Sequence, residues 1–188
     1  MATCLAGAFV LLAVSGCSGD SSSFKAETFS DKDMCIERIQ DHKPLCYGAA
    51  RAEVEKVLTG GEEGGATRVL YDSGVFVYYR GDAVVGFALI EGSEDVYETA
   101  RGARIGMSKK ELMDLYGRKY AYEGTEYNLD YAYDSKTGKL VDKTKVYSGP
   151  IQQKKEQIYR MSAMFDGNNG GGASFIGLLD QKMALFME

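Results

Sequence analysis

The sequence predicts an α+β fold in which two tandem repeats, each a short helix followed by an antiparallel meander, pack side by side. Three observations lead to this prediction. A helix-like segment recurs 58 positions further along the chain, apolar runs suited to strands follow each copy, and turn residues separate those runs. We expect the first repeat at 31–96 and the second at 97–188.

The recurring segment is GAARAEVEKVL at 48–58 and GMSKKELMDLY at 106–116. In both copies apolar residues fall at the i, i+3, i+4 spacing of one helix face. Ser108, followed three residues later by Glu111, is the signature of a capping box at the start of the second helix. Glycines follow both segments, as is typical of helix ends; they are Gly60, Gly61 and Gly117.

Apolar runs rich in β-branched and aromatic residues follow each helix, and Gly-containing turns between them favour hairpins. A glycine lies inside a strand in VVGF at 84–87 and again in FIGL at 175–178, which predicts a bulge or close packing against a helix. The expected strands are 67–71, 75–80, 83–90, 127–133, 158–165 and 173–179, with a closing edge strand at 183–187.

The second repeat is longer because a polar insertion at about 134–157 separates its first two strands. We expect a mobile hairpin or loop there. Long loops often carry function, but a tolerated surface excursion would have the same composition. The preceding strand alternates Tyr and Leu with Asn and Asp, which predicts one buried face and one solvent-exposed face.

The N-terminus carries an apolar run at 5–14 and then Ser15 and Gly16. The stretch VSGC at 14–17 resembles the lipobox of bacterial lipoproteins, although no Lys or Arg precedes it. The resemblance implies that a signal peptide at 1–16 is removed and that Cys17 receives a membrane-anchoring lipid on the extracytoplasmic side. An ordinary cleaved signal with an incidental Cys17 is the alternative. Residues 17–30 begin CSGDSSS and are expected to be a flexible lipidated tether.

Two further cysteines, Cys35 and Cys46, remain after cleavage. Outside the cytoplasm such a pair is a candidate disulfide, and the alternative is two buried free thiols. His42 lies between them, but two cysteines and one histidine lack the ligands and spacing of a zinc site. We therefore expect neither a metal nor a cofactor.

The segment GMSKKELMDLYG at 106–117, with its weaker copy at 48–60, resembles the β-lactamase-inhibitor-protein-like family, which is related in fold to the SmpA/OmlA envelope lipoproteins. In that family a Gly-x-Ser/Thr turn opens a helix that ends in Leu-x-Gly, and three or four strands follow. Ala50 departs from the pattern at the capping position of the first copy. The resemblance implies a protein that binds other proteins, with no catalytic feature in common.

The chemistry-bearing residues do not form a recognisable catalytic motif. His42 is the single histidine, so a Ser-His or Cys-His pair has one possible base. The glycines at 60–65 lack the Gly-Lys-Ser/Thr of a phosphate loop, and DGNNGGG at 166–172 has glycines at two calcium-ligand positions. Two carboxylate pairs, Glu62/Glu63 and Glu91/Asp95, are expected in solvated loops. We therefore predict that the chain is not an enzyme.

Charge and tyrosine content favour a protein partner. A net charge of −5 without a Lys/Arg cluster argues against nucleic acid. The chain has 13 Tyr and no Trp, and Tyr is enriched at interfaces. An open sheet face bearing Tyr78, Tyr79, Tyr131 and Tyr133 is therefore a candidate binding surface; alternatively these rings pack under the helices or fill the outer pleat.

The resulting hypothesis is a non-enzymatic, lipid-anchored extracytoplasmic binding protein that holds a protein partner through its sheet faces or its insertion. One alternative is an inhibitor of a secreted hydrolase, such as a β-lactamase or a cell-wall peptidase. That alternative rests on analogy of fold. A further alternative is a hydrolase that depends on carboxylates alone.

Overall fold

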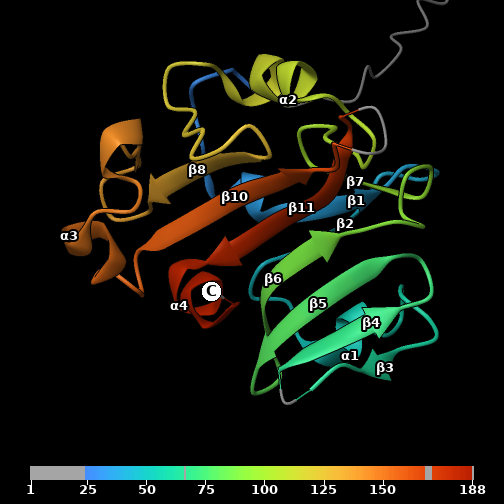
Figure 1. Ribbon diagram of the computed structural model, residues 1–188. Helices are drawn as coiled ribbons and strands as arrows, with labels where there is room; N and C mark the ends of the chain where they lie inside the picture. Colours follow the sequence, from blue (N-terminus) through green and yellow to red (C-terminus); the bar gives the residue numbers. More distant parts are fainter. Residues whose placement is uncertain (1–23, 66, 168–170, 188) are drawn as a thin grey trace, which may run out of the picture.

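Two antiparallel sheets organise the chain in the computed structural model, which describes residues 24–65, 67–167 and 171–187 (Figure 1). The larger sheet has eight strands in the order β3-β4-β5-β6-β11-β10-β8-β9, and the smaller has three in the order β2-β1-β7. Helices lie on both faces of the larger sheet. The expected α+β class is confirmed, with strands predominating.

The larger sheet consists of two meanders joined edge to edge. Strand β6 pairs antiparallel with β11, with Leu89 opposite Ile176 and Gly86 opposite Leu179. The first meander contains β3 (Glu62–Glu63), β4 (Arg68–Tyr71), β5 (Val75–Arg80) and β6 (Ala83–Leu89); the second contains β8 (Asn128–Asp134), β9 (Lys139–Leu140), β10 (Ile158–Phe165) and β11 (Ala173–Asp180). The six main strands therefore lie where the sequence predicts them, to within one residue at each end.

Gly86 allows the two meanders to approach. A Cβ at this position would lie 2.8 Å from the carbonyl oxygen of Leu178 on β11, a backbone atom that cannot move aside. The β5–β6 register also shifts between Tyr78 and Tyr79, so β6 is bulged next to this glycine. The VVGF motif was predicted to mark a bulge or close packing against a helix; the bulge is confirmed, and the close neighbour is strand β11 rather than a helix.

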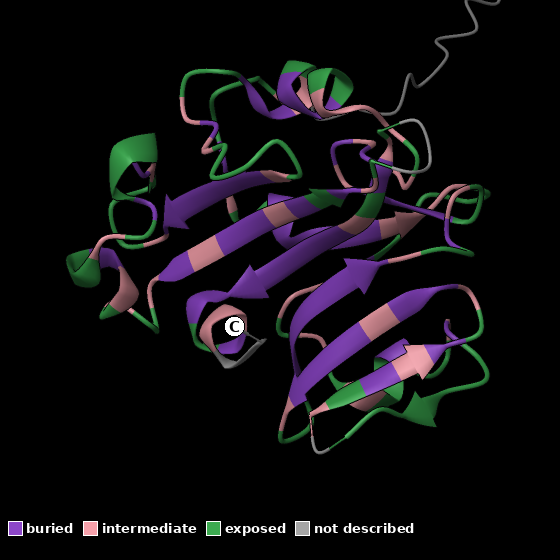
Figure 2. Cartoon of the chain, viewed as in Figure 1, coloured by how far each residue is buried: buried purple, intermediate pink, exposed green. Residues whose placement is uncertain are grey.

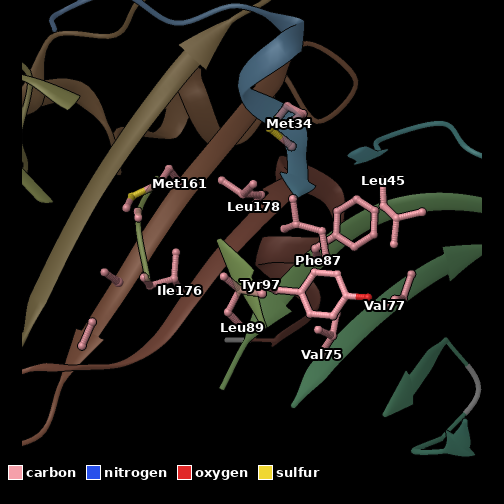
Figure 3. Packing of buried hydrophobic residues seen from close by; sticks show 14 of the residues in the cluster. Met34, Leu45, Val75, Val77, Phe87, Leu89, Tyr97, Met161, Ile176 and Leu178 are labelled. Atoms are coloured by element: carbon pink, nitrogen blue, oxygen red, sulfur yellow. The ribbon is translucent and has the colours of Figure 1, made fainter. Parts of the chain in front are cut away.

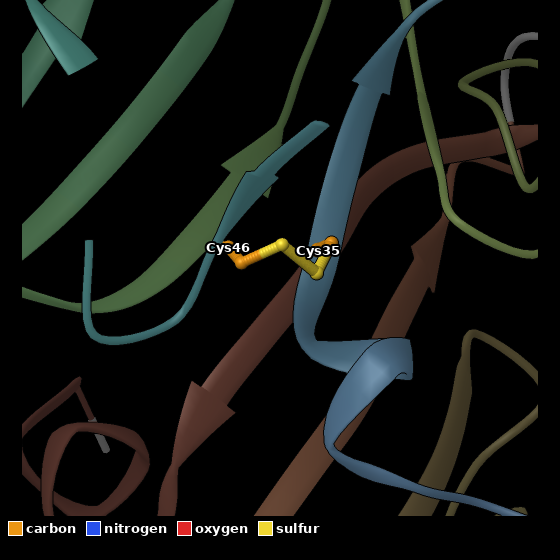
Figure 4. Close-up of a disulfide and its surroundings, with 2 residues drawn as sticks. All are labelled: Cys35 and Cys46. Carbon is orange, nitrogen blue, oxygen red and sulfur yellow. A yellow bond between two sulfur atoms is a disulfide. The ribbon is translucent and has the colours of Figure 1, made fainter. Parts of the chain in front are cut away.

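The smaller sheet is a feature that the sequence did not predict, because its strands are only three or four residues long. It contains β1 (Cys35–Arg38), β2 (Lys43–Cys46) and β7 (Tyr97–Thr99). Cys35 lies opposite Cys46, and a disulfide joins them across β1 and β2 (Figure 4). Because β7 follows the expected repeat boundary at 96/97 and yet pairs with β1, this small sheet spans that boundary.

One hydrophobic core fills the space between the inner face of the larger sheet, the smaller sheet, α1 (Arg51–Val54) and α2 (Lys109–Tyr116). Alternate residues of each long strand point into it, as the pleat of a strand requires. In Figure 3, Met34, Leu45 and Tyr97 from the smaller-sheet side approach Val75, Phe87 and Leu89 of the larger sheet. The core is shared by both meanders, so neither half buries its apolar face alone.

Capping explains why the two predicted helices differ in length. The predicted box is present on α2: the Ser108 amide donates to Glu111 Oε2 (2.8 Å) and the Glu111 amide donates to Ser108 Oγ (3.3 Å). Gly117 ends the helix with φ 95°, where a Cβ would lie 2.5 Å from the Glu27 amide nitrogen. Ala50 gives α1 no such cap, and α1 keeps only four residues of the predicted 48–58.

The C-terminal edge strand predicted at 183–187 is wrong, because this segment is the helix α4 (Gln181–Met187). Strand β11 already has a neighbour on each side and offers no free edge. Asp180 accepts a hydrogen bond from the Met183 amide (2.8 Å) and so starts the helix. Met183 then packs onto the outer face of the larger sheet beside Tyr78 and Val85.

The insertion is a packed layer rather than the mobile loop that we predicted. It contains β9, η2 (Lys143–Lys145) and α3 (Gly149–Gln152). Val141, Val146 and Ile151 are buried against the outer face of β8 and β10. The expected solvent-exposed face of β8 is therefore wrong as well: Asp130 and Asp134 are both 5% exposed, and β8 is almost entirely buried in Figure 2.

The described part of the expected tether, residues 24–30, is attached to the domain by Arg101. Arg101 and Asp33, on η1 (Asp31–Met34), form an ion pair whose side chains are each 1% exposed. Arg101 Nη1 donates to the carbonyls of Lys25 (2.9 Å) and Leu115 (3.1 Å), and Nη2 donates to that of Thr28 (2.6 Å). The prediction of a flexible tether as far as residue 30 is therefore wrong. The carbonyls of Lys25 and Thr28 accept hydrogen bonds from the buried Arg101 guanidinium, which holds this segment against the domain.

Replacing Asp33 with Asn should destabilise the fold by about 3–5 kcal/mol, because the charge of Arg101 would remain buried without its counter-charge. Urea unfolding checks this. Asp31→Asn is the matched control, since Asp31 lies on the same turn but is exposed. Equal unfolding midpoints for the two variants would contradict the assigned role.

Candidate functional site

The four tyrosines proposed for an open sheet face are buried, so they do not form the open surface that we predicted; Tyr79 still lines the pocket described below. Their exposed fractions are 2% for Tyr78, 5% for Tyr79, 1% for Tyr131 and 7% for Tyr133. Tyr79, Tyr131 and Tyr133 point into the shared core, and Tyr78 lies on the other face in the cluster beneath α4. All four rings pack inside the fold, as the alternative interpretation of these tyrosines predicted.

The hydroxyls of the core tyrosines bind within the protein. Tyr131 donates to the carbonyl of Gly117 (2.6 Å), and the hydroxyl oxygens of Tyr71 and Tyr79 are 3.0 Å apart. Burial raises the pKa of Tyr79 and of Tyr131, so both phenols stay protonated. Tyr133 packs against the Phe29 ring at a centroid distance of 5.2 Å. Tyr131 and Tyr133 thus join the second meander to the end of α2 and to the N-terminal segment.

Other residues singled out from the sequence are separated in space. The side chain of His42 is 74% exposed in the β1–β2 turn. Glu62 and Glu63 lie on the edge strand β3 and line different hollows. Within the described residues, no group of three or more His, Cys, Asp or Glu side chains could hold a metal ion. Cys17 and residues 168–170 of the glycine-rich turn lie outside the described residues.

A cavity of about 360 Å³ lies between residues at the end of the β5–β6 hairpin and residues of α4. Four of its lining residues carry a positive charge and one carries a negative charge. We call it the cationic pocket. Its lining residues are Arg51, Glu63, Thr67, Arg68, Tyr79, Arg80, Gly81, Lys182 and Met183.

Arg80 forms the fixed wall of the cationic pocket. Its Nη1 and Nη2 donate to the two carboxylate oxygens of Asp180 at 2.9 and 3.2 Å. The Asp180 side chain is 5% exposed and also accepts hydrogen bonds from the Tyr47 hydroxyl (3.0 Å) and the Met183 amide. One buried carboxylate therefore positions both Arg80 and the beginning of α4.

Arg51 divides its guanidinium between two exposed carboxylates. Its Nε donates to Glu55 (2.7 Å) and its Nη2 donates to Glu63 (2.6 Å). The guanidinium also lies 5.1 Å from the centroid of the Tyr79 ring. Glu63 is therefore the one acidic side chain of the pocket lining, and it occupies the pocket-facing edge of Arg51.

Arg68 and Lys182 complete the positive wall. Arg68 lies over the Phe76 ring at 5.0 Å, and its Nε donates to the Gly64 carbonyl (2.8 Å). No carboxylate of the described residues forms an ion pair with Arg68. Lys182 pairs with Glu156 at 3.4 Å. Arg68 thus carries the least neutralised charge of the pocket.

The cationic pocket suits an anionic group on a ligand of modest size, because its volume lies in the usual range of small-molecule sites and its polar groups converge. Sequence reasoning missed it: its residues come from α1, β3, the β4–β5–β6 meander and α4, with more than a hundred positions between Arg80 and Lys182. No local pattern of charge brings them together.

Comparison with protein-family models, with curated proteins and with solved structures finds no match to this chain. Among the described residues, no helix is both long and apolar enough to cross a membrane.

Beneath the insertion, the outer face of β8 and β10 carries buried polar and charged side chains. Arg160 is 2% exposed, donates to the Val146 carbonyl (2.9 Å) and lies 4.4 Å from the Tyr147 ring centroid. Burial raises the pKa of Asp130, although Ser162 and Tyr147 donate hydrogen bonds to it. The insertion therefore covers polar groups of β8 and β10 and supplies hydrogen bonds to them.

Asp130→Asn should gain stability relative to the wild type as the pH rises from below 3.8 to neutral. A raised pKa means that the folded state binds more protons above the unfolded value of 3.8, so the wild type loses stability as pH rises through that window. The gain should vanish below pH 3.8. Urea unfolding at both pH values measures it.

Asp142→Asn is the control for Asp130→Asn. Hydrogen bonds from Thr144 lower the pKa of the exposed Asp142, so this variant should show no gain at neutral pH. Equal responses of the two variants would contradict the assignment.

Proposed function

We propose that this chain is a non-enzymatic, lipid-anchored binding protein on the extracytoplasmic side of a bacterial membrane, and that it holds its partner at the cationic pocket. The pocket carries the proposal: it gathers four cations from separate elements of an acidic chain. Its one carboxylate, Glu63, accepts a hydrogen bond from Arg51, and the lining contains no second carboxylate that could form a catalytic pair with it. Such a lining suits recognition of charge.

The disulfide supports the proposed compartment. Disulfides form and persist outside the cytoplasm, and Cys35 and Cys46 are joined here. Closing so short a loop stabilises the fold by about 2–3 kcal/mol in the chain-entropy account. Together with the VSGC stretch before it, this bridge favours export of the chain.

The Arg101 ion pair supports a short anchor. It attaches the chain to the domain at Lys25 and Thr28. The eight residue steps from Cys17 to Lys25 can span at most about 28 Å when fully extended. A lipid on Cys17 would therefore keep the domain, and its pocket, near the membrane surface.

We further propose that the two halves are copies of one repeat, and the backbone hydrogen bonds support this. Gly48 donates to Val84 and Val84 donates to Ala49; correspondingly, Gly106 donates to Ala173 and Ala173 donates to Met107. Each copy of the recurring segment thus bonds to the start of the last strand of its own meander, β6 or β11. The cationic pocket then lies where α4 of one copy meets strands of the other, a common place for a ligand site.

Metabolic labelling with a palmitate analogue tests the anchor. The wild type should incorporate the label and Cys17→Ala should lose it. Cys35→Ser, which changes a cysteine outside the lipobox, should keep it. Label retained by Cys17→Ala would refute the lipid attachment.

A pull-down from detergent-solubilised envelope tests binding. The full chain should recover a partner, and Arg68→Ala should recover less of it because the pocket loses its least neutralised cation. Lys143→Ala, an exposed lysine on the insertion, should match the wild type. Equal recovery by Arg68→Ala and wild type would place the partner elsewhere, and recovery of nothing above background would refute a binding role.

A further inference from the structure

We propose that the cationic pocket binds an oxyanion group of its ligand, a carboxylate or a phosphate, in the place now taken by the Glu63 carboxylate. Glu63 would thus be a built-in competitor that the ligand displaces from Arg51. This inference rests on the proposed function, because it takes the pocket as the binding site. It adds the chemical class of the ligand and the residue that controls affinity.

The ion pairs of the pocket differ in how firmly they are held. Asp180 is buried and accepts hydrogen bonds from Arg80, Tyr47 and the backbone of α4, so a ligand cannot replace it without disturbing the fold. Glu63 accepts from Arg51 alone among the described side chains, and its side chain is 61% exposed. Exposed ion pairs of this kind contribute little to stability. Glu63 is therefore the replaceable partner.

The segment that carries Glu63 is weakly attached. Strand β3 has two residues, lies at the edge of the larger sheet, and pairs only through Glu62–Leu70 and Glu63–Val69. It lies within GGEEGG, where glycines on both sides reduce the hindrance to movement. A rotation of the Glu63 side chain, or a small shift of β3, is sufficient to free the edge of Arg51.

The guanidinium of Arg51 is prepared for an incoming oxyanion. Glu55 accepts a hydrogen bond from its Nε, the guanidinium lies 5.1 Å from the centroid of the Tyr79 ring, and Nη2 donates to Glu63. Arg68, which lies over the Phe76 ring, and Lys182 on α4 also line the pocket. An oxyanion at the Glu63 position would accept charge-assisted hydrogen bonds from the Arg51 guanidinium, in a pocket lined by further cations, and a planar guanidinium suits carboxylates and phosphates.

Isothermal titration calorimetry on the full chain, with inorganic phosphate and succinate as probes at low ionic strength, tests the proposal. Glu63→Gln should bind the preferred probe about three- to tenfold more tightly than wild type, because the internal competitor is lost. Glu62→Gln is the matched control: it makes the same charge change one residue away but lines the neighbouring hollow beside Asp72 and Glu91. It should change affinity by less than about twofold.

Arg68→Gln should weaken binding by about tenfold, while Arg118→Gln, an exposed arginine after α2, should not. The two probes separate the sources of the oxyanion: a preference for phosphate assigns a phosphorylated ligand, and a preference for succinate assigns a carboxylate ligand. Unfolding curves for each variant show that the fold is retained.

Equal affinities of Glu63→Gln and Glu62→Gln would overturn the role of Glu63. Absence of heat with both probes for wild type and for Glu63→Gln would overturn oxyanion binding altogether. Either result leaves the proposed function standing if the pull-down still recovers a partner that Arg68→Ala releases.

Discussion

Strand β6 pairs with β11 along four residue positions, and most of the molecule depends on that contact. It turns two short meanders, each too small to bury its apolar face alone, into one sheet with one core. It also places the C-terminal helix α4 on strands of the first meander, which creates the cationic pocket. Gly86 permits it, because any larger residue would collide with the backbone of β11.

Buried charges determine which parts of this fold are fixed. Arg101 with Asp33 holds the N-terminal segment, and Asp180 holds Arg80 together with the start of α4. Both carboxylates are almost fully buried, and removing Asp33 would leave the Arg101 charge unpaired and away from water. Glu63 is the contrast: it pairs with Arg51 at an exposed edge, where solvent can replace the contact. Arginine–carboxylate pairs thus fix the fold where the carboxylate is buried, and leave a replaceable contact where the carboxylate is exposed, at Glu63.

Local patterns predicted the long elements well. Strand β10 has the bounds read from its apolar alternation, and α2 begins at the predicted capping box of Ser108 and Glu111. The alternation of polar and apolar residues did not predict exposure correctly. Asp130 was expected to be solvent-exposed because its neighbours in sequence are apolar, yet the insertion covers it. The segment at 183–187 was predicted as an edge strand, but β11 has no free edge and the segment forms a helix. The site escaped prediction since its cations are scattered along the chain.

The sequence by itself determined the antiparallel meanders, the capped helix α2, the lipobox resemblance at Cys17 and the cysteine pair as a disulfide candidate, because each depends on spacing within a few residues. The tertiary structure decided what is covered and what meets: the burial of the four tyrosines, the smaller sheet, the attachment of residues 24–30 and the cationic pocket. These depend on contacts between segments far apart in the chain, whose pairing is set by the packing of one shared core and not by any local pattern.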